Sequence, residues 1–213
     1  MALRNDLSPN MERRKKFILF ALVLFIGIGL DQLTKFVARD HFVLAVYSDD
    51  DVEGLQVTGG RQVQAGMCKR PADDIPVLGR LFRFTYAEND GAFLSLGATW
   101  DPTIRLIVLT ILPGILLLGV LVYMLASDKV GRSESWAFSL IAAGGIGNII
   151  DRVAAGWVVD FMHMDFWGIT QTGVFNVADL YIMAGIGVYL VAYFKQIRSE
   201  KEDGGDTSQT DLT

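Results

Sequence analysis

The sequence contains one stretch in which polar side chains repeatedly meet apolar runs, from Gly144 to Asp179: GGIGNIIDRVAAGWVVDFMHMDFWGITQTGVFNVAD. Asp151 lies at the end of one apolar run, Asp179 lies at the start of the next, and Asp160 lies between them. Ionisable side chains at the edge of a hydrocarbon layer are costly, so they usually mark functional sites and need partners. These three carboxylates predict such a site, with partners supplied by the rest of the chain.

Four apolar runs in the 213-residue chain predict membrane-spanning helices. Hydrophobic residues make up 51% of the sequence and the mean hydropathy is positive, which favours membrane spans over a water-soluble core. A span needs roughly 20 apolar residues, and the third run reaches that length only by including Val153 and Ala154. The predicted spans are residues 17–38, 104–126, 136–154 and 174–194.

Basic residues cluster before the first span, between the second and third, and after the fourth. They are Arg13 to Lys16, then Lys129 and Arg132, then Lys195, Arg198 and Lys201. Lys and Arg are in excess on the cytoplasmic side of membrane proteins. We therefore expect one integral membrane domain over residues 1–213, with both termini and the tail 195–213 in the cytoplasm. Residues 39–102 and 152–173 are then external.

The external segment 39–102 contains a loop pattern and a strand pattern. Ser48 to Pro76 is rich in Asp, Gly and other polar residues without periodicity, and is expected to form a loop insert. Phe82, Phe84 and Tyr86 alternate with polar residues, as in a half-buried strand, and residues 42–47 are the expected partner strand. The predicted fold is an all-α membrane protein: four transmembrane helices with a small external β-sheet at the outer membrane face.

Two polar groups outside the opening stretch are candidates for the site. Asp31 and Lys35 lie four residues apart at the outer end of the first span, which places them on one helix face in the favourable order for an ion pair. Such a pair either only neutralises the span end or also serves the site, and the spacing leaves both open. Asn89 precedes Asp90-Gly91, a turn signal, and either forms only the turn or also aims its amide at the site.

The three carboxylates of the opening stretch differ in their neighbours. Asp151 is followed directly by Arg152 and ends a Gly-rich helix, so an ion pair that organises the helix end and positions the arginine is expected. Asp160 has no adjacent base, and Asp179 lies within the apolar start of the fourth span. Asp160 and Asp179 are therefore the two acids without an evident neutralising partner.

Several other chemistries are disfavoured by the sequence. A net charge of -5 without a basic, aromatic-rich stripe argues against nucleic-acid binding. Cys68 is the single cysteine and has no catalytic neighbour, and His163 has no second ligand at zinc-binding spacing. Asn148 stands where the Gly-x-Gly-Asp motif of presenilin-like and prepilin-type intramembrane peptidases has its Asp. No serine-hydrolase or phosphate-loop motif is present, and neither a metal nor a cofactor is expected.

Five short motifs resemble those of the bacterial lipoprotein signal peptidases, also called signal peptidase II or prolipoprotein signal peptidase. Each motif is weak alone, but five in chain order within a small four-span protein are highly specific. The stretch from Ser48 to Pro76 is longer than the compact external segment usual in that family. The motifs are Asp31-x-x-Thr34-Lys35, Asn89-x-Gly91-Ala92, Gly147-Asn148-x-x-Asp151-Arg152, Val159-Asp160-Phe161 and Phe175-Asn176-x-Ala178-Asp179.

The resemblance implies an aspartic peptidase of the bacterial inner membrane, with Asp160 and Asp179 as the catalytic dyad near the outer face and a small sheet that cradles the substrate. The implied substrate is a prolipoprotein that carries diacylglycerol on a Cys and is cut just before that Cys. Membrane lipids and globomycin-like peptide inhibitors are the other implied partners, and a monomer is expected. The residues implied to support the site are Asp31, Lys35, Asn89, Gly91, Asn148, Asp151, Arg152 and Asn176.

A pair of carboxylates fits peptide hydrolysis without a metal. Two acids at close range share a proton, so one takes a proton from the attacking water while the other donates to the developing oxyanion. A proton-coupled transporter is the alternative from another class, with Asp31, Asp151 and Asp179 as relay groups, but no internal repeat supports it. A membrane scaffold without chemistry would leave Asp160 and Asp179 unexplained.

Overall fold

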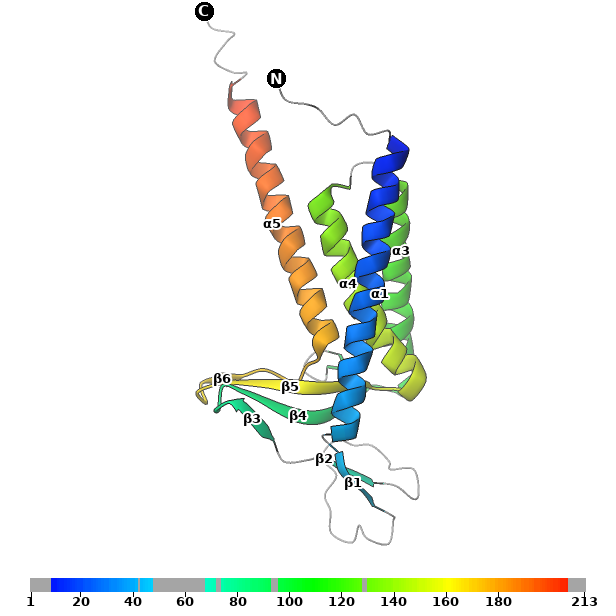
Figure 1. Ribbon diagram of the computed structural model, residues 1–213, viewed down its shortest axis with the longest axis vertical. Helices are drawn as coiled ribbons and strands as arrows, with labels where there is room; N and C mark the ends of the chain where they lie inside the picture. Colours follow the sequence, from blue (N-terminus) through cyan, green and yellow to red (C-terminus); the bar gives the residue numbers. More distant parts are fainter. Residues whose placement is uncertain are drawn as a thin grey trace, which may run out of the picture.

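The computed structural model has a bundle of long helices that stands on a small β-sheet (Figure 1). It describes residues 9–41, 43–47, 68–71, 74–92, 96–127 and 130–206. The helix α1 begins and the helix α5 ends at the same end of the bundle, opposite the sheet (Figure 1). Residues 48–67 of the predicted loop insert, Phe42, and residues 207–213 of the predicted tail lie outside the described residues.

The prediction of four spans is confirmed, since four helices in the described part of the chain are long and apolar enough to cross a membrane. The first, third and fourth spans are α1 (Pro9–His41), α4 (Arg132–Ala155) and α5 (Val177–Asp206). The second is formed by α2 (Pro102–Leu106), a π-helical turn η3 (Ile107–Ile111) and α3 (Leu112–Ala126). The π-helical turn ends two residues before Pro113, which has no backbone N–H to continue the regular ladder.

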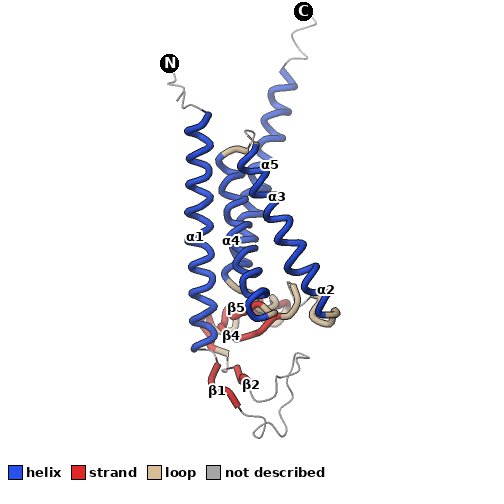
Figure 2. Tube along the Cα trace, turned by 90° about the vertical axis from the view of Figure 1, so that its right-hand side faces the viewer, coloured by secondary structure: helices blue, strands red, loops and turns tan. Residues whose placement is uncertain are grey.

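The helix α4 lies between α1 and α3, as Figure 2 shows, and it also packs against α5. Glycines allow the close approach of α4 and α5. A Cβ atom on Gly144 would collide with the carbonyl oxygen of Ala178, and one on Gly185 would lie 2.7 Å from the carbonyl oxygen of Ala137. Small residues at such contacts allow helices to associate in lipid, where no hydrophobic force drives them together. This packing brings the C-terminal half of α4 next to the start of α5.

The sheet has four antiparallel strands in the order β3-β4-β5-β6. They are β3 (Ile75–Leu78), β4 (Phe82–Asn89), β5 (Val158–Phe166) and β6 (Thr170–Gln171). The predicted strand around Phe82 to Tyr86 is therefore present as β4, within a small sheet as expected. Its predicted partner is wrong, because β4 pairs with β3 and β5. The strand β1 (Val43–Tyr47) pairs instead with β2 (Cys68–Pro71), in a separate two-stranded sheet.

Two further sequence expectations need correction. The predicted loop from Ser48 to Pro76 contains β2 and the start of β3, so it is not a loop throughout. Residues 152–173, for which the sequence analysis expected only an external position, contain the end of α4 and the whole β5–β6 hairpin, so that expectation was incomplete. The strand β5 escaped prediction because its first six residues are buried whichever way they point, which removes the alternation of a half-buried strand.

A small apolar core joins the sheet to the helices. Ala38 of α1 packs with Tyr86 of β4 and with Val159, Phe161 and Met162 of β5. A second core, built around Phe20, Met124, Val130 and Ala142, holds the other end of the bundle. The sheet is thus fixed to the last turns of α1, and the residues of β5 are held against the ends of α4 and α5.

Candidate active site

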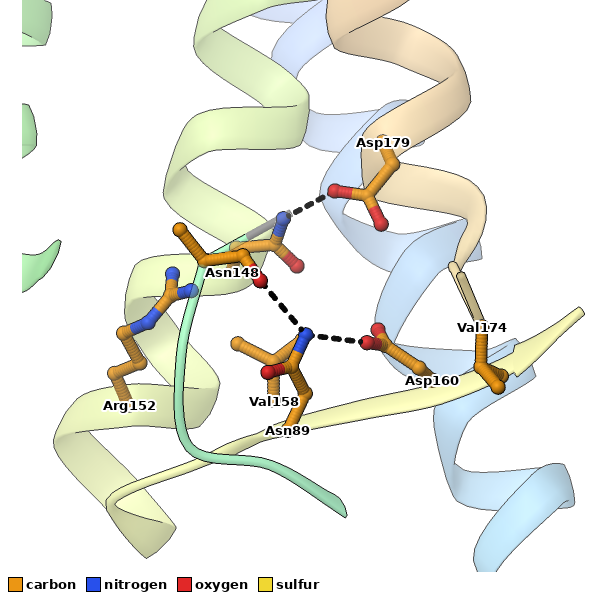
Figure 3. A pocket seen from close by; sticks show the side chains of 8 residues that line it. Asn89, Asn148, Arg152, Val158, Asp160, Val174 and Asp179 are labelled. Carbon is orange, nitrogen blue, oxygen red and sulfur yellow. Dashed lines mark hydrogen bonds between the residues drawn. The ribbon is translucent and has the colours of Figure 1, made fainter. Parts of the chain in front are cut away.

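A small polar pocket opens where α4, α5 and the strands β4 and β5 meet (Figure 3). Figure 3 shows Asn148 and Arg152 of α4 on one side and Asp160 and Asp179 on the other. The cavity volume is about 20 Å³, which is room for one ordered water molecule. The lining residues are Asn89, Ala92, Asn148, Arg152, Val158, Asp160, Val174 and Asp179.

Asp160 of β5 is 2% exposed and is held by two side-chain amides. Asn89 Nδ2 donates to Asp160 Oδ2 at 2.9 Å, and Asn176 Nδ2 donates to Asp160 Oδ1 at 2.6 Å. Burial raises the pKa of Asp160 to about 7; the nearby carboxylate of Asp179 adds to the rise, and the two amides oppose it. Asp160 can therefore hold a proton near neutral pH.

Asp179 lies in the first turn of α5 and is part of the cap of that helix. Asn176 Oδ1 accepts from the backbone N–H of Asp179 at 3.1 Å, and Asp179 Oδ2 accepts from the backbone N–H of Asn176 at 3.1 Å. This is the reciprocal arrangement of a capping box, formed here by Asn and Asp three residues apart. Asn148 Nδ2 donates to the other oxygen, Asp179 Oδ1, at 3.0 Å. Both oxygens of the Asp179 carboxylate therefore accept a hydrogen bond, one from the backbone and one from Asn148.

Asn148 and Asn176 link the two carboxylates to each other. Asn176 Nδ2 donates to Asn148 Oδ1 at 3.1 Å as well as to Asp160. Lys35 Nζ also donates to Asn148 Oδ1, at 2.9 Å. Because Oδ1 of Asn148 accepts from two donors, its Nδ2 must face Asp179. The amide orientation is thus set by the network.

A layer of ion pairs lies next to the amides, on the side of α1. Lys35 Nζ contacts Asp31 Oδ2 at 2.9 Å and Asp151 Oδ2 at 3.1 Å, and all three side chains are almost fully buried. The predicted pair of Asp31 and Lys35 is therefore present, and it also contacts the site through Asn148. Asp31 Oδ1 accepts from the backbone N–H of Ala178 at 3.0 Å, at the start of α5.

The expected pairing of Asp151 with Arg152 is replaced by other contacts. Asp151 pairs with Lys35 and with Arg39, at 3.5 Å, and accepts from the backbone N–H of Val159 at 3.2 Å. Arg152 Nη2 donates instead to the carbonyl oxygen of Gly91 at 2.8 Å. Asp151 therefore ties α1 to the start of β5. The guanidinium group of Arg152 lies at the pocket, and its buried Nε has no hydrogen-bond partner among the described residues.

Asn89 forms the predicted turn and also directs its amide at the site, which is the second of the two possibilities that the sequence left open. Its Oδ1 accepts from the backbone N–H of Gly91 at 2.9 Å, while its Nδ2 donates to Ala92 O at 3.1 Å and to Asp160. The same turn places the Gly91 carbonyl oxygen where it accepts a hydrogen bond from Arg152. All ten sequence-predicted site residues therefore belong to one connected network.

Gln32 is part of this network and was missed by the sequence analysis. Its Nε2 lies within hydrogen-bonding distance of Asp31 Oδ2, Asp151 Oδ1 and the carbonyl oxygen of Gly147, at 3.1 to 3.2 Å. Its position between Asp31 and Lys35 was an available signal. His163 lies three residues after Asp160 and on the opposite face of β5, so it is not part of the pocket. Among the described residues, no group of three His, Cys, Asp or Glu side chains could hold a metal ion.

Comparison with known proteins decides the family. The family model described as signal peptidase (SPase) II matches residues 23–195, which is more than half of the chain. The chain belongs to the signal peptidase II family. It is therefore a peptidase, and its four spans make it a multi-pass membrane protein. The match includes every residue of the network described above.

Individual relatives agree with the signal peptidase II assignment. A lipoprotein signal peptidase of Chlorobium luteolum is 38% identical over 136 residues, covering 61% of this chain and 78% of that protein. One from Clostridium acetobutylicum is 30% identical over 183 residues, covering 86% and 97%. A solved structure described as a bacterial membrane enzyme, determined by the in meso method at 2.3 Å resolution, has a TM-score of 0.62 at 23% identity, covering 86% of this chain and 92% of that one. That structural likeness supports the fold.

Proposed function

We propose that this peptidase removes the signal peptide from diacylglyceryl-modified prolipoproteins, by cutting just before the lipidated Cys, and that Asp160 and Asp179 are its catalytic dyad. The observation that carries this proposal is the placement of both carboxylates on one polar pocket with room for a water molecule. The family membership and the names of the relatives support the substrate class. The ion pairs argue against the transporter alternative, because Asp31 and Asp151, two of its proposed relay groups, both contact Lys35.

The first chemical step needs one protonated and one ionised carboxylate. The raised pKa of Asp160 favours Asp160 as the proton carrier, which leaves Asp179 as the base. Each carboxylate then acts once as acid and once as base during turnover. Asp179 then takes a proton from water as the water oxygen bonds to the scissile carbonyl carbon, and Asp160 donates its proton to the oxyanion.

The second step breaks the peptide bond. The protonated Asp179 gives its proton to the amide nitrogen, the C–N bond breaks, and the diol formed in the first step returns a proton to Asp160 as it becomes a carboxylic acid. The products are the signal peptide with a free carboxyl group and the lipidated Cys with a free amino group. Asn148 and Asn176, which donate to the two carboxylates, hold them in place through both steps.

The position of the pocket at the end of the bundle suits a substrate that is half in the bilayer. Helix surfaces around it carry exposed apolar side chains such as Leu33 and Phe36 of α1, which a bilayer would cover. Acyl chains can remain in lipid while the peptide follows the sheet. Orientation of this kind can lower a barrier by several kcal/mol. Globomycin-like peptides and a monomeric state remain predictions from the family resemblance.

We also propose that the sheet and pocket lie at the outer face of the bacterial inner membrane, with both termini in the cytoplasm. The start of α1 and the end of α5 share the end of the bundle opposite the sheet (Figure 1), and basic residues flank both. Reporter fusions within residues 48–67 and at the C-terminus measure this orientation. An external C-terminus would contradict it.

The decisive experiment compares two substrates on the purified, lipid-reconstituted protein. A precursor peptide with diacylglycerol on its Cys should be cut before that Cys, and the same peptide without the lipid should be cut far more slowly. Release of the signal peptide, followed by mass spectrometry, gives both the rate and the cleavage position. Equal rates for the two peptides would contradict the role of the lipid, and cleavage elsewhere would contradict the proposed specificity.

A further inference from the structure

The free end of the sheet carries a patch of exposed apolar side chains that the proposed chemistry does not use. This patch, called the sheet tip, consists of Leu78 at the β3–β4 turn and Trp167 and Ile169 at the β5–β6 turn. Their side chains are 64%, 75% and 87% exposed. The two turns are adjacent, because the backbone N–H of Asp165 donates to the carbonyl oxygen of Leu81 at 3.0 Å. Large apolar side chains grouped in this way mark contact sites.

The β5–β6 turn holds Trp167 outward at a conformational cost. Trp167 has φ +57°, in the left-handed region where Gly or Asn is usual, and Gly168 follows with φ +76°. The carboxylate of Asp165 accepts from the backbone N–H of Gly168 at 2.7 Å, and Ile169 N–H donates to the Phe166 carbonyl at 3.1 Å. A Trp in a position that suits a smaller residue indicates a use for the side chain itself.

The sheet tip belongs to a hairpin that is anchored at the ends of two membrane-crossing helices. The strand β5 begins three residues after α4 ends, and β6 ends six residues before α5 begins, so both ends of the hairpin are tied to membrane-crossing helices. Ala38 of α1 packs against β5, while Phe36 and Val37 beside it expose apolar side chains. The apolar surface of α1 therefore continues to the height of the sheet.

The hairpin carries its tip sideways from the bundle. Nine residues of β5 extend about 26 Å at about 3.3 Å per residue. Figure 1 shows the sheet lying across the direction of the helices, with β6 and the β5–β6 turn beyond the lower end of α5. The tip therefore projects over the bilayer that surrounds α5 and not into the aqueous space below.

We propose that the sheet tip inserts Leu78, Trp167 and Ile169 into the interface between the headgroups and acyl chains of the outer leaflet. Trp is enriched at this depth because its ring is apolar and its N–H can still reach polar groups. Arg80, exposed in the same β3–β4 turn, can bind headgroup phosphates. The lipid interface thus holds the far end of the sheet, while Ala38 and its neighbours hold the near end.

The test measures the surroundings of Trp167 and does not depend on peptidase activity. Trp100, Trp136 and Trp157 are replaced by Phe in the full chain, which is then reconstituted into vesicles of phosphatidylcholine and phosphatidylglycerol. Some vesicles contain acyl chains brominated near the glycerol backbone, which quench Trp fluorescence only at that depth. Acrylamide, added to the water phase, quenches exposed Trp. A chain that keeps only Trp136, which is 40% exposed near the other end of α4, is the positive control for lipid contact.

We expect the fluorescence emission of Trp167 to be shifted to the blue relative to a free Trp analogue. It should lose most of its intensity in brominated vesicles and be protected from acrylamide. Emission at the wavelength of a free Trp analogue, with strong acrylamide quenching, would overturn it. Protection from both quenchers would also overturn it, because protein would then cover the tip. Should the triple variant not fold, the difference between the native chain and Trp167→Phe isolates the same emission. The same outcomes then apply.

Discussion

Four carboxylates meet at the end of the bundle next to the sheet, in two layers that differ in their partners. Asp31 and Asp151 both contact the ammonium group of Lys35, at 2.9 and 3.1 Å. Asp160 and Asp179 receive uncharged amide donors instead, and they line the pocket. The first pair is thus tied to a cation, whereas the second pair is held by donors that bring no charge of their own. This difference fits the proposal that Asp31 and Asp151 support the structure while Asp160 and Asp179 carry the chemistry.

Asn148 is the only side chain that joins the two layers by hydrogen bonds among those described here. Its Oδ1 accepts from Lys35, and its Nδ2 donates to Asp179. The difference between the layers can therefore be tested by changing one layer and measuring both stability and turnover. The following predictions run from the largest expected effect to the smallest.

The largest effect is expected in the amide-bound layer. Asp160→Asn and Asp179→Asn each keep the size of the side chain but remove the group that carries the proton. Each should abolish measurable turnover, since the general acid-base contribution alone is typically about 10²–10⁴-fold. The measurement is the cleavage rate of the lipidated precursor, normalised to correctly folded protein. Substrate binding should survive, and activity retained by either variant would assign the dyad to the wrong residues.

The ion-pair layer should respond through stability. Lys35→Met leaves Asp31 buried without its cation and leaves Asp151 with only Arg39, at 3.5 Å. Loss of one partner from a buried pair costs roughly 3–5 kcal/mol. Thermal and denaturant unfolding in detergent measure this loss. Lys195→Met removes an exposed lysine and is the matched control, with little expected change. Equal stability of the two variants would show that the buried cation is not needed.

The pH dependence of stability separates the layers further. Burial raises the pKa of Asp160 from an ordinary 3.8 to about 7 in the folded protein. Between these values the folded state keeps a proton that the unfolded chain has released, so stability falls as pH rises through this window. The slope is at most about 1.4 kcal/mol per pH unit.

Asp160→Asn should remove this slope, which melting temperatures measured across the window would show. Asp74→Asn is the control, because Asp74 is exposed and forms an ion pair with Arg83 outside the pocket, so this variant should keep the slope. An unchanged slope in Asp160→Asn would mean that another group is responsible.

The smallest effect is expected from Asp151→Asn. The variant keeps the size of the side chain, and Lys35 keeps Asp31, so the loss of stability should be about 1–3 kcal/mol. Activity should fall only in proportion to the folded fraction. Cleavage rate and melting temperature, measured on the same preparation, test this proportion. A stable but inactive Asp151→Asn protein would place Asp151 in the chemistry and remove the distinction between the layers.

The spans and the site residues could be predicted from the sequence for different reasons. The spans could be predicted because the length and apolar composition of a segment largely determine whether it can cross a bilayer as a helix. The candidate site could be predicted because carboxylates at the ends of apolar runs are rare enough that Asp160 and Asp179 stood out, and the family motifs added Asn148 and Asn176. Both signals are local in the sequence.

The pairing of the strands and the orientation of the amide side chains could not be predicted from local sequence. The pairing of β4 with β5 joins residues about seventy positions apart, and burial on both faces hides β5 from a search for alternation. Lys35 turned out to be the partner of Asp151 in place of Arg152, because helix packing brings α1 to α4 and no spacing rule encodes that contact. The orientation of Asn148 likewise depends on two donors from different helices.

The cap of α5 has a consequence for how the enzyme matures in the membrane. The side-chain oxygen of Asn176 caps the first turn of α5, and its side-chain nitrogen donates hydrogen bonds to Asp160 and Asn148. A chain whose last span has been inserted but has not yet docked lacks these bonds, so Asp160 and Asp179, the proposed catalytic acids, are neither aligned nor held. We expect cleavage to begin only when the whole bundle has assembled, which spares neighbouring membrane proteins from an unfinished protease.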